Sequence, residues 1–89
     1  MDNAFAMKVK VRLFAIARER AGVQETWLVA PTDATVAQVL AQLGQQFPKL
    51  PPILQRAMVA VNREYVDRDH VLSDSDEVAV IPPVSGGAQ

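Results

Sequence analysis

The sequence predicts a small α+β domain in which one amphipathic helix covers a β-sheet. Two patterns support this prediction. Apolar and polar residues alternate over 7–14, which is the period-two signal of a strand with one buried face. Between 36 and 47 apolar residues recur at helical spacing, as in a helix packed on a sheet. Because 89 residues leave room for one core, both elements belong to one domain.

The first third of the chain reads as two strands joined by a short helix. Residues 15–21 are rich in helix formers and stop at Gly22, which is typical of a short helix with a glycine cap. The segment 24–30 contains β-branched and aromatic residues and ends at Pro31. We therefore expect the strands 7–14 and 24–30 to pair as a hairpin with a wide loop.

The clearest element is the amphipathic helix. Its apolar stripe follows the spacing i, i+3, i+4, i+7 and i+11, with Val36, Val39, Leu40, Leu43 and Phe47. Thr35 and Gln38 have the form of a capping box, and Pro48 marks where the helix must already have ended. The stripe could dock a partner helix, but a small α+β domain needs it to cover the sheet.

The second half contributes a further buried strand. After the proline-interrupted stretch 48–52 and a short turn at 53–56, the apolar run 57–61 reads as a buried strand. Residues 62–64 turn the chain, and 65–66 add a brief edge strand.

A polar loop and one more strand complete the predicted domain. The loop spans 67–76 and carries Val71 and Leu72 as its apolar anchors. The last strand spans 77–81. Two prolines end it, because neither can donate a ladder hydrogen bond, and they stiffen the exit of the chain.

The chain is thus expected to have three parts. Residues 1–6 form an N-terminal extension without a structural signal, residues 7–83 form the domain, and residues 84–89 form the tail. The tail contains the pair Gly86-Gly87. Glycine can follow an extended path through a gap too narrow for other residues, and its carboxylate is the least hindered. Such an end suits chemistry on the chain's own terminus inside another protein's pocket.

Composition excludes several classes of function. The sequence has no cysteine, hence no disulfide, thiolate metal site or cysteine nucleophile. Nine basic against ten acidic residues give a net charge of −1, which argues against a nucleic-acid partner. No apolar run approaches the roughly 20 residues that span a bilayer, and the start lacks a signal-peptide pattern. We expect a cytoplasmic protein without membrane contact.

His70 is the only histidine, and it lies among scattered aspartates. This spacing does not match a ligand set or a catalytic triad, so we expect no metal site and no catalytic residue in the chain.

Phe14 is a candidate contact residue for a partner. Alternation places it with Lys8, Lys10 and Arg12 on the sheet face opposite the core, where an exposed aromatic ring could anchor another protein. Alternatively, it ends the strand and folds into the core. Met58 and Ala60 share that outer face if their valine neighbours point inward, and the three would form an apolar docking patch.

The order of elements and several motifs resemble the β-grasp, ubiquitin-like sulfur carriers, most closely the small subunits of molybdopterin synthase. The resemblance covers roughly residues 7–87. The matching stretches are Lys8-Val9-Lys10-Val11-Arg12-Leu13-Phe14-Ala15, Thr35-Val36, Val59-Ala60-Val61-Asn62, Leu72-Ser73-Asp74-Ser75-Asp76-Glu77-Val78 and Ile81-Pro82-Pro83-Val84-Ser85-Gly86-Gly87. The resemblance implies a β-grasp fold, a mixed sheet covered by one main helix, with a flexible C-terminal tail.

The resemblance also implies a function without an active site in this chain. Gly87 would be adenylated by an ATP-using enzyme resembling ubiquitin activators and then carry sulfur as a thiocarboxylate. Val84, Ser85 and Gly86 would enter the large synthase subunit, whose catalytic groups pass the sulfur to a pyranopterin precursor of molybdopterin. The chain itself would bind no cofactor, and ATP would be used by the activating enzyme.

One departure from the family concerns the end of the chain, where Ala88 and Gln89 follow the glycine pair. Gly87 cannot be adenylated while its carbonyl is in a peptide bond. A protease therefore removes the two residues, or the chain is an inactive precursor, or it has another function. Three alternatives stay open: a sulfur carrier for thiamine or another thiolated product, a ubiquitin-like protein modifier, and a binding module with an inert tail.

Overall fold

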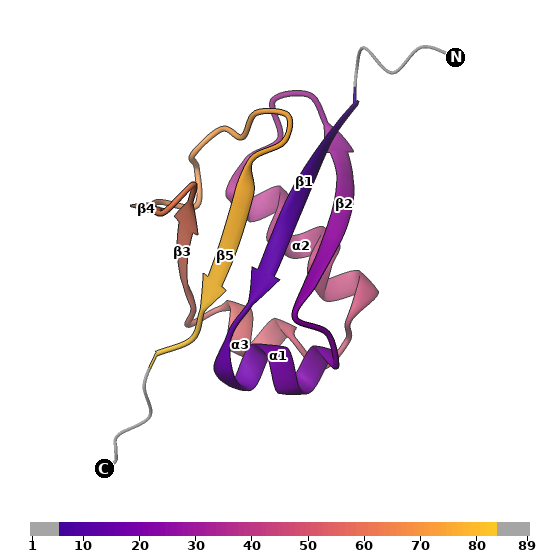
Figure 1. Ribbon diagram of the computed structural model, residues 1–89, viewed down its shortest axis with the longest axis vertical. Helices are drawn as coiled ribbons and strands as arrows, with labels where there is room; N and C mark the ends of the chain where they lie inside the picture. Colours follow the sequence, from indigo (N-terminus) through magenta and orange to yellow (C-terminus); the bar gives the residue numbers. More distant parts are fainter. Residues whose placement is uncertain (1–5, 84–89) are drawn as a thin grey trace.

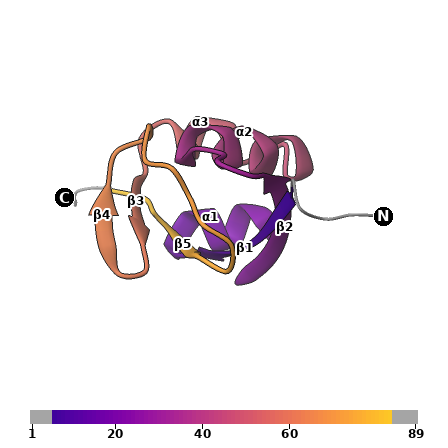
Figure 2. The same cartoon turned by 90° about the horizontal axis from the view of Figure 1, so that it is seen from above.

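The computed structural model describes residues 6–83, in which a five-stranded sheet is covered on one face by helix α2 (Figures 1 and 2). Along the chain the elements are β1 (Ala6–Leu13), α1 (Ala15–Ala21), β2 (Glu25–Pro31), α2 (Val36–Gln46), α3 (Pro51–Leu54), β3 (Met58–Val61), β4 (Glu64–Val66) and β5 (Glu77–Ile81). The helices α1 and α3 lie at the end of the sheet where β5 finishes (Figure 1).

The sheet is mixed, as predicted. Its strand order is β2-β1-β5-β3-β4. The neighbours β1 and β5 are parallel, and the three remaining neighbouring pairs are antiparallel. The predicted hairpin of the first two strands is present, since β1 pairs with β2 across the loop that contains α1. Both β1 and β5 therefore have a hydrogen-bonded neighbour on each side.

The two predicted helix boundaries have the expected local causes. Gly22 has φ 81°, a left-handed conformation, and its N–H donates to the Arg18 carbonyl at 2.8 Å, which closes α1. At the start of α2 the Thr35 N–H donates to Gln38 Oε1 at 2.8 Å, and the Gln38 N–H donates to Thr35 Oγ1 at 3.3 Å. This is the predicted capping box.

The core lies between the sheet and α2. The inward residues of β1 are all buried, with Val9 and Val11 at 0% exposure. Four of the five stripe residues of α2 are buried as well, while Phe47, the residue that caps the helix, is half-buried against the core. The stripe thus covers the sheet, and the alternative of a partner-docking stripe is wrong.

The segment after the amphipathic helix differs from the prediction. The short helix α3 occupies the end of the proline-interrupted stretch and the first half of the turn expected at 53–56, with Pro51 and Pro52 in its first turn, and residues 55–56 form a turn as predicted. Proline is compatible with this position because the first N–H groups of a helix have no partner within the helix.

The loop between β4 and β5 has one apolar anchor instead of two. Leu72 is buried, and its N–H donates to the Ala34 carbonyl at 2.9 Å. Val71 is 52% exposed, so its prediction as an anchor is wrong. Val71 forms an isolated bridge with Thr35, and consecutive side chains of extended backbone point to opposite sides, so only one of the two can face the core.

Within residues 6–83, no helix has the length and apolar character needed to cross a bilayer.

Candidate functional site

The tail residues that the sequence singled out, Val84, Ser85, Gly86 and Gly87, lie outside the described residues 6–83, as does the predicted flexibility of the tail. Their roles therefore stay predictions. The structure does describe the chain that leads to them. β5 ends at Ile81, Pro82 is buried, and Pro83 is exposed.

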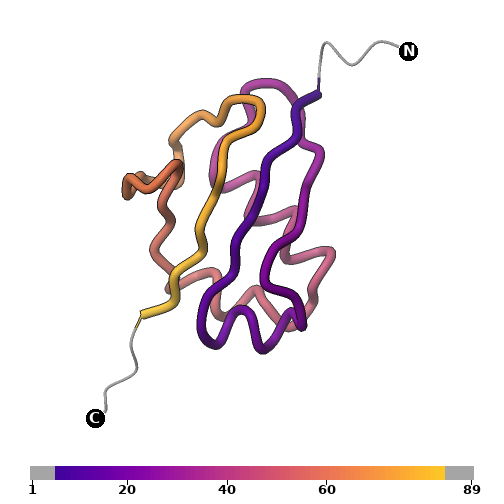
Figure 3. Tube along the Cα trace, in the orientation of Figure 1, coloured from indigo at the N-terminus to yellow at the C-terminus, as the bar shows by residue number. Residues whose placement is uncertain are grey.

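The strand that precedes the tail, β5, lies at the centre of the sheet. The trace in Figure 3 shows β5 running between β1 and β3 toward the end that carries α1 and α3. The Phe14 N–H donates to the Val80 carbonyl at 3.3 Å, which joins the residue before α1 to the end of β5. The point from which the tail departs is thus held by neighbouring elements on both sides.

The sheet face away from α2 carries an apolar cluster next to this exit. Strand register places Met58 beside Ile81, and Ala60 beside both Ala79 and Tyr65. Side chains directly opposite each other on paired strands share one face. We call this cluster the outer patch, and its residues are Phe14, Met58, Ala60, Tyr65, Ala79 and Ile81.

The three residues predicted for partner contact all lie in the outer patch, in different environments. Met58 is 53% exposed. Phe14 is half-buried and lies on the outer face, not in the core, as the first of its two alternatives placed it, and its contact with a partner stays a prediction. Ala60 is only 6% exposed, because it is small and sits between Tyr65 and Ala79 at the floor of a hollow of about 220 Å³.

Tyr65 and Ile81 also belong to the patch, although sequence reasoning did not select them. Tyr65 is 64% exposed and projects from the short edge strand β4, and Ile81 ends β5. The signal that could have found them is the pairing register, since both lie opposite residues already predicted for the outer face. Sequence alone did not specify that register.

Charged groups border the outer patch. The Arg12 guanidinium lies 5.4 Å from the centroid of the Phe14 ring, a cation–π arrangement, and pairs with Glu77 at 3.1 Å. Arg63 lines the same hollow. The border is polar and the centre apolar, which is the usual anatomy of a protein-binding surface.

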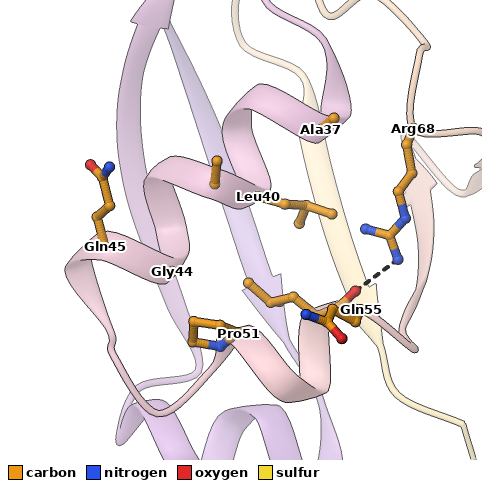
Figure 4. A pocket seen from close by; sticks show the side chains of 9 residues that line it. Ala37, Leu40, Gly44, Gln45, Pro51, Gln55 and Arg68 are labelled. Carbon is orange, nitrogen blue, oxygen red and sulfur yellow. Dashed lines mark hydrogen bonds between the residues drawn. The ribbon is translucent and has the colours of Figure 1, made fainter.

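A second groove lies on the helix side of the molecule, and residues that line it hold neighbouring elements together. It measures about 400 Å³ between α2 and α3 (Figure 4). A Cβ on Gly44 would stand 3.2 Å from Pro51 Cγ, so glycine permits the close approach of the two helices here. Arg68 reaches over this groove from the β4–β5 loop (Figure 4) and donates hydrogen bonds to the backbone carbonyls of Leu54, the last residue of α3, and of Ala57.

In the part of the chain that the structure describes, no three histidine or acidic side chains come together in a way that could hold a metal ion. His70 is exposed in the β4–β5 loop. What the geometry offers is a surface for binding, the outer patch, placed beside the exit of the C-terminal segment.

Comparison with known proteins agrees with this arrangement. The sequence profile described as "ThiS family" matches residues 11–87. A protein of Chlamydomonas reinhardtii named "Molybdopterin synthase sulfur carrier subunit" is 42% identical over 84 residues, covering 91% of this chain and 100% of the relative.

Two solved structures extend the comparison. SAMP1 from Haloferax volcanii superposes with a TM-score of 0.82 at 30% identity, covering 90% of this chain and 99% of that chain. The complex of subunits 1 and 2 of the molybdopterin-converting factor from Helicobacter pylori contains a chain with a TM-score of 0.65 at 27% identity, covering 91% of this chain and 100% of that chain.

Proposed function

The chain belongs to the ThiS family, among relatives that are molybdopterin synthase sulfur carrier subunits, and we propose that it carries sulfur for molybdopterin synthesis. The observation that carries the proposal is the 42% identity to such a subunit over that relative's full length. The β-grasp fold is common to many proteins, whereas the family profile matches residues 11–87 and so includes Val84-Ser85-Gly86-Gly87.

In the proposed cycle the reacting group is the carboxylate of Gly87, freed by removal of Ala88 and Gln89. An ATP-using activating enzyme adenylates this carboxylate and releases pyrophosphate. A sulfur nucleophile then displaces AMP and leaves a thiocarboxylate on Gly87. Adenylation is needed because a carboxylate is a poor electrophile, and the adenylate supplies a leaving group.

The role of the described residues is to deliver this end. Pro82 and Pro83 restrict the path of the chain as it leaves β5, because each proline fixes its own φ. The outer patch then binds the large subunit, while Val84, Ser85 and Gly86 enter that subunit's active site. A complex of subunits 1 and 2 is known for the Helicobacter pylori relative, which supports such a partner.

The proposal also covers the cofactors, the processing enzyme and the cellular compartment. The chain binds no cofactor of its own, ATP is consumed by the activating enzyme, and a protease trims the tail. All of these steps take place in the cytoplasm, consistent with a sequence free of cysteine.

The test is the intact mass of the protein recovered from its native cell. Loss of Ala88 and Gln89 together with replacement of one oxygen by sulfur is the expected result. An untrimmed and unmodified chain in cells that are making molybdopterin contradicts the proposal.

A second candidate function is covalent modification of other proteins. It is favoured by the similarity to SAMP1, because a protein of that name is described as a small archaeal modifier. This function predicts conjugates of higher mass, in which Gly87 forms an isopeptide bond to lysines of targets. Immunoblots of denatured lysate distinguish the two functions, because a pure sulfur carrier yields no such conjugates.

A further inference from the structure

A groove opens directly beside the point where the chain leaves the domain. It measures about 410 Å³ and lies between α1, α3 and the end of β5. Its apolar surface comes from Ile16 and Ile53 and from the prolines that follow β5, and its charged surface comes from Arg20 and Arg56. We call it the exit groove.

The two arginines of the exit groove are exposed and have no carboxylate partner within residues 6–83. The two ion pairs in that range are Lys10–Glu25 and Arg12–Glu77, on the sheet. Arg20 lies in the last turn of α1, and Arg56 follows α3. Both guanidinium groups therefore remain available to an external acceptor.

Charge is distributed unevenly along the molecule. At the end with α1 and α3, the basic residues Arg18, Arg20, Lys49 and Arg56 outnumber the acidic residues Glu19 and Glu25. The opposite end is formed by the loop between β4 and β5 (Figure 1), where four acidic residues, Asp67, Asp69, Asp74 and Asp76, outnumber one basic residue, Arg68. The exit end is thus the basic end of a chain whose net charge is −1.

Any protein that encloses the residues after Pro83 must approach this end. Because Pro82 and Pro83 themselves line the exit groove, a partner that surrounds the tail comes into contact with the groove. The exit groove and the outer patch share no residue, and both reach the end of β5, where the patch includes Ile81 and the groove includes Pro82 and Pro83. A single partner can therefore contact both.

We propose that the exit groove binds an acidic segment of the large synthase subunit that receives the tail, with an apolar side chain between Ile16 and Ile53 and carboxylates on Arg20 and Arg56. This inference rests on the proposed function and adds a second contact surface to it. Arginine suits the role because its planar guanidinium binds carboxylates in a bidentate manner.

The experiment measures the affinity of the full-length chain for the purified large subunit of the same organism, by calorimetry at low and at high salt. The test variant is the double charge reversal Arg20→Glu with Arg56→Glu. We expect it to weaken binding at low salt by about tenfold or more, and to reduce the dependence of affinity on salt.

Lys49→Glu is the matched control. Lys49 is an exposed cation that does not line the exit groove, so its reversal should change the affinity by less than about twofold. The neutral double variant, Arg20→Gln with Arg56→Gln, provides a second test that avoids new negative charge. Its expected affinity lies between those of the wild type and the charge-reversed chain. Unfolding midpoints of all variants should equal that of the wild type, because both arginine side chains are exposed.

Equal affinities of the wild type and both double variants overturn the exit-groove inference and leave the proposed function standing. A loss of the same size in Lys49→Glu also overturns it, because the effect is then one of net charge. A wild-type chain that fails to bind the large subunit overturns the proposed function, and the inference with it.

Discussion

The guanidinium of Arg68 donates a hydrogen bond of 2.7 Å to the backbone carbonyl of Leu54, the last residue of α3. The same nitrogen also donates to the Ala57 carbonyl at 2.8 Å. The last carbonyls of a helix have no N–H donor within the helix, so they accept hydrogen bonds from groups outside it. Arg68 supplies one from the β4–β5 loop and fixes that loop to the segment between α3 and β3.

Replacement of Arg68 by alanine should therefore destabilise the domain. We expect a loss of about 1–3 kcal/mol in the free energy of unfolding, because both carbonyls lose the Arg68 donor and the Leu54 carbonyl keeps only the longer bond from the Ala57 N–H, at 3.4 Å. Urea denaturation followed by circular dichroism measures this. Arg56→Ala is the control, since Arg56 is exposed and should change stability little; equal losses in the two variants contradict the assignment.

Gly22→Ala tests the cap of α1. Nothing lies within 4 Å of the position of an added Cβ, so the cost comes from the backbone, which has φ 81°. We expect a loss of about 1 kcal/mol, the cost of a left-handed conformation for an L-residue. Gly22→Asn should cost less, because asparagine tolerates this conformation better. Thermal unfolding of the two variants gives the comparison, and equal midpoints for both and the wild type argue against the cap.

Thr35→Ala removes the side-chain acceptor of the α2 capping box. The expected loss is about 1 kcal/mol, because the Gln38 N–H loses its acceptor at the start of the helix. Thr35→Ser keeps the hydroxyl and should retain most of the stability. Chemical denaturation of both variants measures the difference, and a serine variant as unstable as the alanine variant shows that the methyl group matters instead.

Met58→Asp tests the outer patch. Placing a carboxylate on this apolar surface should weaken binding to the large subunit by about tenfold or more without changing stability, because Met58 is 53% exposed. Val71→Asp is a matched control, since Val71 is 52% exposed and lies in the β4–β5 loop, outside the patch. Calorimetric titration of each variant against the large subunit measures the effect. Unchanged binding by the Met58 variant removes the patch from the interface.

A chain that ends at Gly87 tests the role of the overhang. Deleting Ala88 and Gln89 frees the Gly87 carboxylate, so the activating enzyme should adenylate this chain directly, whereas the 89-residue chain should require prior trimming. Pyrophosphate release with purified components measures the reaction. Gly87→Trp in the shortened chain is the control and should abolish it, because the bulky side chain hinders approach to the terminus. Equal activity of the full-length and shortened chains contradicts the requirement for trimming.

The elements with strong local signals were predictable from sequence. The stripe of α2 and the alternation of β1 reflect burial of one face, and the caps at Gly22 and Thr35 depend on neighbours close in sequence. The helix α3 was missed because two prolines usually interrupt a helix, and only their position in its first turn makes them compatible with one.

The parts of the site that depend on long-range pairing were predicted less completely. Met58 and Ala60 were placed on the outer face from alternation alone, but the burial of Ala60 follows from Tyr65 and Ala79 on the neighbouring strands. The contact of Arg68 with Leu54 joins residues 14 positions apart, and the polar loop gave no local signal for it. Register and tertiary contacts of this kind are set by the whole fold.

The parallel pairing of β1 with β5 has a consequence for synthesis of the protein. Lys10 lies opposite Glu77, so β1 cannot pair with β5 until almost the entire chain has been synthesised. A nascent or truncated polypeptide that lacks β5 has no strand to join β1 to β3, so the continuous five-stranded sheet cannot form. Folding therefore acts as a check on completeness: only a polypeptide translated through Ile81 presents the surfaces that a tail-accepting enzyme could recognise.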